Sequence, residues 1–350
     1  MIERRKTKLV KVGSLSIGSG APVSVQSMLN VEAHNIPGNV AQAKALEDAG
    51  CQLIRVAVPD LAAVPTVAAL KEAVSAPIVA DIHFNHKIAL ACADAGVDKI
   101  RINPGNIGAD ENVKAVADKC REKGIPIRIG VNSGSVEKEI LAKYGAPTPA
   151  AMAESAMYHV RLLEKFDFDD IVISIKSSNV QSMIEAYRLV AGQCAYPLHL
   201  GVTESGTEHM GLVKSAVGIG TLLMEGIGDT IRVSLTADPV KEVAAGFDIL
   251  AAAGLKNDRP TLVCCPTCGR TKIDLISLAH QVEERLQSVQ KAITVAVMGC
   301  VVNGPGEARE ADIGIAGGDG CGLVFKKGEI IKKVSEEALL DALMDEIALL

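Results

Sequence analysis

Eight short runs rich in valine and isoleucine alternate with amphipathic stretches of helical length between residues 23 and 253. Near-continuous apolar runs joined by helical crossovers indicate parallel strands buried on both faces of a sheet. Eight strand–helix units in roughly 250 residues match the number of units and the length of a (β/α)8 barrel. The predicted strands are residues 23–28, 53–58, 78–84, 99–103, 126–131, 170–176, 198–203 and 230–235. The main alternative is an open doubly wound sheet, but no Gly-x-Gly-x-x-Gly turn opens the first helix.

A polar stretch rich in chain breakers, residues 254–260, follows the last predicted barrel helix at 239–253. We place a domain boundary there, which predicts an α/β barrel over residues 1–255 and a small α+β domain over residues 256–350. The elements expected in the second domain are a strand (261–264), a helix (272–286), a strand (293–297), a Gly/Pro loop (302–306), two more short strands and a helix from residue 336.

Charge and composition exclude several classes of partner. Lysine and arginine number 36 against 42 acidic residues, a net charge of −6, so bulk charge attracts neither nucleic acid nor anionic membranes. Aromatic residues make up only 3% of the chain, too few for the stacking platforms of single-strand binders. No apolar run reaches the roughly 18 residues that a membrane span needs, and no signal peptide is evident. We expect a cytoplasmic protein with no nucleic-acid or membrane partner.

Polar side chains gather at the carboxyl ends of the predicted strands, which form the catalytic face of such a barrel. They are Gln26, Ser27, Arg55, Asp81, His83, Arg101, Asn103, Arg128, Asn132, Lys176, Ser177, His199, Glu204, Arg232 and Ser234. The cations lie on five different strands and would converge on one mouth, where unpaired like charges are costly unless an anion neutralises them. The only carboxylates expected there are Asp81 and Glu204. The excess of cations predicts a substrate with at least two negative charges, and guanidinium groups suit phosphate or diphosphate.

Two carboxylates are expected to play different parts. Glu204 lies in a turn directly after a strand and is the best-placed group for proton transfer. Asp81 is expected to orient His83 or an arginine.

The second domain holds a cluster of cysteines that suits a metal centre. Five of the nine cysteines lie there: Cys264, Cys265, Cys268, Cys300 and Cys321. Cys265 and Cys268 form a C-x-x-C knuckle, but neither a second knuckle nor a pair of histidines completes a closed zinc site. Three cysteines with one oxygen ligand suit a [4Fe-4S] cluster better. Cys264 and Cys321 remain alternative ligands.

Motifs along nearly the whole chain resemble the bacterial 4-hydroxy-3-methylbut-2-enyl diphosphate synthases. The strings are VQSM (25–28), ADIHF (80–84), RINPGNIG (101–108), RIGVN (128–132), LHLGVTE (198–204), RVS (232–234), CPTC (265–268) and GCVVNGPGE (299–307). The resemblance implies a two-electron reductive ring opening and dehydration of 2-C-methyl-D-erythritol 2,4-cyclodiphosphate to (E)-4-hydroxy-3-methylbut-2-enyl diphosphate, in the non-mevalonate isoprenoid pathway.

The same resemblance implies roles for individual residues. A [4Fe-4S] cluster would be bound by Cys265, Cys268, Cys300 and Glu307. The diphosphate would be held by Arg55, Arg101, Arg128, Lys176, Arg232 and Ser234. The reacting carbons would be surrounded by His83, Asn103, Asn132, Glu204 and Asn303, with Asp81 close by.

The resemblance also implies partners: flavodoxin or ferredoxin as the electron donor, and a head-to-tail homodimer in which each cluster domain caps the partner's barrel. Two other functions are considered. One is a non-redox barrel enzyme for a phosphorylated metabolite, in the style of dihydropteroate synthase, with a metal-stabilised tail. The other is a non-enzymatic iron–sulfur carrier, for which the barrel cations would be dispensable.

Overall fold

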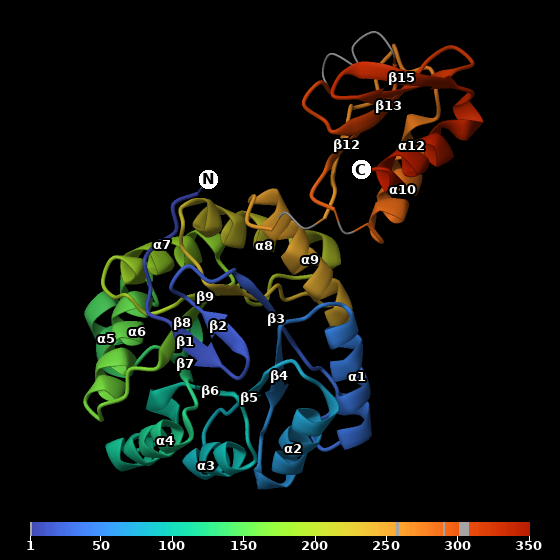
Figure 1. Ribbon diagram of the computed structural model, residues 1–350. Coiled ribbons are helices and arrows are strands. Elements are labelled where there is room, and N and C mark those ends of the chain that lie inside the picture. Colours follow the sequence, from blue (N-terminus) through green and yellow to red (C-terminus); the bar gives the residue numbers. More distant parts are fainter. Residues whose placement is uncertain (1, 257–258, 290, 301–307) are drawn as a thin grey trace. The chain divides into compact units, whose positions relative to one another are not determined.

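The chain folds into two compact units, residues 1–255 and 256–350 (Figure 1). The computed structural model describes residues 2–256, 259–289, 291–300 and 308–350. In the first unit, eight parallel strands are ordered β8-β7-β6-β5-β4-β3-β10-β9. A parallel bridge between Ile173 and Leu198 connects the two ends of this sheet and closes it into a barrel. The predicted barrel fold is therefore confirmed, and the open doubly wound sheet is wrong.

All eight predicted barrel strands are present, and helices surround them (Figure 1). The strands are β3 (Ser24–Met28), β4 (Leu53–Ala57), β5 (Ile78–Asp81), β6 (Lys99–Ile102), β7 (Ile127–Asn132), β8 (Ile171–Lys176), β9 (His199–Leu200) and β10 (Thr230–Ile231). The helices are α1 (Ile36–Asp48), α2 (Val64–Ala73), α3 (His86–Asp94), α4 (Asp110–Lys123), α5 (Lys138–Tyr144), α6 (Pro149–Glu164), α7 (Val180–Ala191), α8 (Glu208–Met224) and α9 (Pro239–Ala252). Short 3-10 turns are η1 (Leu61–Ala63), η2 (Pro104–Asn106) and η3 (Ser133–Ser135).

Local sequence signals fix where several of these helices begin and end. The Asn35 side chain accepts a hydrogen bond from the Gly38 N–H and caps α1. Thr148 caps α6 in the same way, directly before Pro149, whose fixed φ suits the first helical position. Gly124 ends α4 with φ of +66°, a conformation that favours glycine.

A hairpin that the sequence analysis did not predict closes the amino-terminal end of the barrel. It consists of β1 (Val10–Val12) and β2 (Leu15–Ile17), which are too short to show a periodic pattern. Its apolar side chains pack against residues near the beginnings of three barrel strands, in a cluster that comprises Val10, Val12, Ile17, Leu53, Val79 and Val172. The hairpin is thus the floor of the barrel, and the strand ends at the opposite side carry the polar side chains.

The second unit is a five-stranded mixed sheet with helices on one face. Its strands follow the order β11-β12-β13-β14-β15 and are β11 (Thr261–Cys264), β12 (Thr294–Met298), β13 (Ile313–Gly317), β14 (Gly322–Lys326) and β15 (Glu329–Val334). The helices α10 (Leu275–Leu286) and α12 (Leu339–Ala348, after the 3-10 turn η4, Glu336–Ala338) share one apolar cluster with the sheet.

Two details of the second unit differ from the prediction. Three strands rather than two follow the Gly/Pro loop, because β15 is largely exposed and lysine-rich and lacks an apolar pattern. Helix α10 begins at Leu275 and not at residue 272, because the Asp274 side chain caps it through the Ser277 N–H. Among the described residues, no helix is both long and apolar enough to cross a membrane.

Candidate functional site

The five predicted cations all lie on the barrel strands or directly after them. Arg55, Arg101 and Arg128 lie within β4, β6 and β7, Lys176 ends β8, and Arg232 follows β10. The three strand arginines are nearly inaccessible, with exposed fractions of 3%, 4% and 0%. The fold therefore brings the cations into one barrel interior, as the sequence predicted.

Asp81, at the end of β5, is the counter-ion at the centre of this group. Its carboxylate accepts hydrogen bonds from Arg55 Nη2 and from Arg101 Nη1, the latter at 3.0 Å, and lies 3.4 Å from His83 Nε2. Burial acts to raise the pKa of Asp81, but the Arg55 charge, the His83 hydrogen bond and the Arg101 charge outweigh it and hold this pKa well below its usual value. Asp81 is thus an ionised partner that orients both arginines and His83, which fits the orienting role expected for it.

Glu242 is a further buried carboxylate, and the expectation that only Asp81 and Glu204 supply carboxylates was wrong. It reaches the barrel from α9, where it accepts a hydrogen bond from Ser27 Oγ at 3.2 Å and lies 3.6 Å from Arg232 Nη2. A carboxylate on a crossover helix could not be placed from strand patterns alone.

Many of the buried cationic donors have no hydrogen-bond partner among the described residues. They are Arg55 Nε and Nη1, Arg101 Nε, Arg128 Nε, Nη1 and Nη2, Arg232 Nε, and Lys99 Nζ. Buried charged donors without an acceptor are costly. The interior is therefore prepared for an anion with several oxygens.

Lys99 is a cation that the sequence analysis missed. It lies two residues before Arg101 on β6, so both side chains point to the same side of the strand. The alternation of side chains along β6 was the signal that could have revealed Lys99. It was missed because only residues at the carboxyl ends of the strands were expected to be functional.

Two amides at neighbouring strand ends are joined by one serine. Asn103 Nδ2 donates to Ser135 Oγ at 3.2 Å, and the same oxygen accepts from the Asn132 N–H at 3.0 Å. Asn132 Oδ1 is buried with no partner among the described residues. Ser135 thus ties the Asn103 side-chain amide to the Asn132 backbone, and the Asn132 side-chain oxygen is left to bind a ligand.

Glu204 lies in the loop between β9 and α8, and this loop is fastened to the loop after β10. Ser205 Oγ donates to the Ser234 carbonyl, and the Thr236 N–H donates to the Gly206 carbonyl at 3.3 Å. Glu204 itself is exposed and has φ of +51°, a conformation that costs a non-glycine residue roughly 1–2 kcal/mol. Strain of this kind concentrates at functional positions.

The cysteines of the second unit follow two neighbouring parallel strands. In the pairing of β11 with β12, Cys264 lies opposite Val297, so Cys265 and Cys268 follow one strand end and Cys300 the next. The Gly299 N–H donates to Cys265 Sγ at 3.2 Å, and the Lys272 N–H donates to the Gly299 carbonyl at 3.0 Å.

The described part of the chain contains no preformed group of three or more metal-binding side chains. The Arg270 backbone lowers the pKa of Cys268, whereas burial raises that of Cys264. Two predicted site residues, Asn303 and Glu307, lie outside the described residues.

Both units match models of one protein family. The GcpE TIM-barrel domain matches residues 7–247, and the GcpE protein C-terminal domain matches residues 261–349. The chain belongs to the GcpE family. A relative from Clostridium perfringens is 58% identical over 343 residues, 98% of either chain. Another, from Caldanaerobacter subterraneus, is 58% identical over 348 residues, 99% of this chain and 98% of its own. Both are named 4-hydroxy-3-methylbut-2-en-1-yl diphosphate synthase (flavodoxin).

Solved structures resemble the barrel of this GcpE chain in fold alone. Dihydropteroate synthase of Yersinia pestis superposes with a TM-score of 0.51 at 16% identity, over 70% of this chain and 98% of that one. 3-Dehydroquinate dehydratase of Geobacillus kaustophilus gives a TM-score of 0.51 at 15% identity, over 71% of this chain and 99% of that one.

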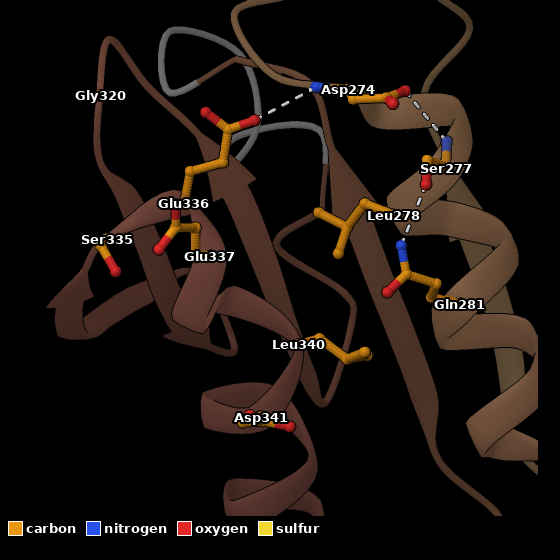
Figure 2. Close-up of a pocket in the computed structure, with 10 residues that line it drawn as sticks. All are labelled: Asp274, Ser277, Leu278, Gln281, Gly320, Ser335, Glu336, Glu337, Leu340 and Asp341. Carbon is orange, nitrogen blue, oxygen red and sulfur yellow. Dashed lines mark hydrogen bonds between the residues drawn. The ribbon is translucent and has the colours of Figure 1, made fainter.

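A large pocket in the second unit of the GcpE chain has the wrong charge for a diphosphate. Its volume is about 790 Å³, and Figure 2 shows it between the start of α10 and the residues around η4. Four carboxylates line it: Asp274, Glu336, Glu337 and Asp341. Like charges repel, so a polyanionic substrate belongs in the barrel.

Proposed function

We propose that this chain catalyses the two-electron reductive ring opening and dehydration of 2-C-methyl-D-erythritol 2,4-cyclodiphosphate to (E)-4-hydroxy-3-methylbut-2-enyl diphosphate. The observation that carries the proposal is the set of buried, unpartnered guanidinium and ammonium donors in the barrel. Membership in the GcpE family and the names of the relatives support this reaction over the non-redox alternative.

We assign the diphosphate to Arg55, Arg101, Arg128, Lys176, Arg232 and Ser234. The ring opens by breaking a carbon–oxygen bond to phosphate, and charge develops on the departing oxygen. Positioned cations stabilise that charge and hold the substrate in one pose. Asp81 contributes by orienting Arg55, Arg101 and His83.

We assign proton transfer to Glu204 and the orientation of the carbon skeleton to His83, Asn103 and Asn132. Loss of the hydroxyl as water requires a proton on the departing oxygen, which a carboxylic acid at the mouth can donate. Ser135 fixes the Asn103 side-chain amide and the Asn132 backbone, so both residues start from a defined position. Asn303, outside the described residues, completes this set.

We assign an iron–sulfur cluster of the [4Fe-4S] type to Cys265, Cys268 and Cys300, with Glu307 as the fourth ligand. The donor set fits, because thiolates are the usual ligands of such clusters and the Gly299 N–H already donates to Cys265 Sγ. When bound, the cluster would pass on two low-potential electrons from the donor, one at a time, and would supply a Lewis-acidic iron. In the sequence, Asn303 belongs to the Gly/Pro loop (302–306) and Glu307 follows it directly.

We propose flavodoxin as the electron donor, in keeping with the relatives' names, with ferredoxin as the alternative. We further propose a head-to-tail homodimer in which the cluster domain of one protomer serves the barrel of its partner.

The test is anaerobic conversion of the cyclodiphosphate with reduced flavodoxin, in the wild type and in Gly130→Ala. A Cβ at Gly130 would overlap the Arg101 guanidinium. We expect the wild type to form the product and Gly130→Ala to raise KM at least tenfold. Gly220→Ala is the matched control, because a Cβ there meets no atom within 4 Å. Absence of product from the cluster-loaded wild type would contradict the proposal.

A further inference from the structure

Lys99 is a fully buried lysine to which the proposed reaction assigns no role. Its exposed fraction is 0%, and Nζ has no hydrogen-bond partner among the described residues. An isolated buried ammonium is one of the costliest groups that a protein can contain, so a lysine in this place needs a reason.

The register places Lys99 deep in the barrel, below Arg101 and Arg128. Across β5 and β6, Lys99 lies opposite Val79, and Asp81 lies opposite Arg101. Val79 packs against the floor hairpin. Lys99 is therefore one step nearer the floor than the Arg101–Asp81 pair.

The charged and titratable groups around this region come from seven of the eight barrel strands or the residues that follow them, and from two helices. They are Arg55 (β4), Asp81 (β5), Arg101 (β6), Arg128 (β7), Lys176 (β8), His199 (β9) and Arg232 (after β10), with the Tyr187 hydroxyl from α7 and Glu242 from α9. Cations greatly outnumber carboxylates in this set. Burial, and then the charges of Arg128 and Arg55, lower the pKa of Lys99 well below its usual value, which favours the neutral amine in the free protein.

We propose that Lys99 is a proton acceptor that becomes charged when the diphosphate enters the barrel. The inference rests on the proposed function. The amine takes one proton from solvent and becomes an ammonium; no other bond forms or breaks. A bound diphosphate adds negative charge above the floor, which favours the charged form of a nearby amine. The free protein thus avoids a further buried cation, and the loaded barrel gains one.

Two other bases nearby have a lowered pKa, His199 and Lys176. Burial and the surrounding cations, Arg128 first, lower the pKa of His199 well below its usual value. Even if a diphosphate cancelled this shift completely, an imidazole would return only to about 6.5 and stay largely neutral at pH 8, whereas a lysine returns toward about 10.4. Substrate-driven protonation at pH 8 therefore points to a lysine. Lys99 is fully buried and its Nζ has no partner among the described residues, whereas Lys176 is only half-buried at the end of β8, so we assign the proton to Lys99.

The test is calorimetric binding of the cyclodiphosphate to the oxidised holoenzyme, without reductant so that no turnover occurs. Each phosphorus of this ligand carries one acidic oxygen, so the ligand stays a dianion between pH 7 and 9. Titrations at pH 8 in buffers of different ionisation enthalpy count the protons taken up. We compare the wild type with Lys99→Met, His199→Gln and the exposed control Lys44→Met.

We expect the wild type, His199→Gln and Lys44→Met to take up about one proton per bound ligand, and Lys99→Met to bind with none. In the proteins that keep Lys99, Kd should rise about tenfold per pH unit between the free and bound pKa values, because one proton accompanies binding. In Lys99→Met, Kd should be independent of pH. If Lys99→Met does not fold, Lys99→Gln, which likewise cannot take up a proton, replaces it and should bind with no uptake.

Binding by the wild type without proton uptake would overturn the inference and leave the proposed function standing. So would uptake that persists in Lys99→Met or disappears in His199→Gln. Failure of the wild type to bind the cyclodiphosphate at all would contradict the proposed function itself.

Discussion

At the scale of single residues, Asp81 is the counter-ion that Arg55 and Arg101 share. Its carboxylate is nearly inaccessible and contacts two guanidinium groups. Asp81→Asn keeps the size of the side chain but leaves Arg55 and Arg101 buried without a counter-ion. We expect a loss of about 3–5 kcal/mol in the free energy of unfolding. Urea denaturation at pH 7 measures it, with the half-exposed Asp118→Asn as the control; equal stability of Asp81→Asn and the wild type would contradict the assignment.

The depressed pKa of Asp81 also sets the sign of a pH effect. A carboxyl group whose pKa is lower in the folded state contributes its full stability above the unfolded value of about 3.9 and loses it as pH falls toward the folded value. We expect the stability difference between the wild type and Asp81→Asn to shrink as pH falls below about 4. Thermal melts between pH 3 and 7 check this, and a difference that grows toward acid pH would be inconsistent with an ionised Asp81.

Two substitutions of Glu204 test its effect on stability and its effect on activity separately. Glu204→Gly relieves the positive φ, and we expect the free energy of unfolding to rise by about 1 kcal/mol while turnover is lost. Glu204→Gln retains the shape, and we expect turnover to fall by about 10²–10⁴ with little change in substrate Kd, as for loss of a general acid. Full turnover of the glutamine variant would rule out proton transfer by Glu204.

At the scale of elements, the floor hairpin is held by a few apolar contacts. Ile17 is fully buried in the cluster with Leu53, Val79 and Val172. We expect Ile17→Ala to lower the free energy of unfolding by about 2–5 kcal/mol. The half-exposed Leu9 is the control, and Leu9→Ala should change stability little. Thermal unfolding of both variants measures the contrast; similar melting temperatures would mean that the hairpin does not support the barrel.

The same elements show how far the sequence could predict this fold. The apolar runs around residues 53–58 and 170–176 are buried on both faces, and this double burial gave a clear signal. The hairpin strands span three residues each, so no periodicity could reveal them. Strand β15 was missed because its side chains are mostly exposed and charged.

The site residues divide in the same way: some stand out in a local sequence pattern, and others meet only in the folded chain. Arg101 and Arg128 could be predicted because polar residues at strand ends interrupt an apolar pattern. Glu242 could not, because a carboxylate on a crossover helix meets Arg232 only through tertiary folding, and Lys99 was missed although it alternates with Arg101 on β6. The pairing of Cys265 with the Gly299 N–H likewise depends on the register of β11 and β12.

At the scale of the whole molecule, we assign diphosphate binding to the barrel and cluster binding to the second unit. The barrel supplies buried cations for a diphosphate, and the second unit supplies three cysteines at adjacent strand ends. The central claim is that the cysteines hold a redox cluster that meets the substrate bound in a barrel. Each unit alone would be only an anion-binding barrel or an iron–sulfur carrier.

The most direct test measures iron and acid-labile sulfide in the anaerobic protein, together with EPR of the dithionite-reduced protein with and without the cyclodiphosphate. The wild type and Glu307→Ala are compared. We predict about four irons and four sulfides per chain, and an EPR signal that changes when substrate is added. Zinc without sulfide, or a cluster signal indifferent to substrate, would contradict the account.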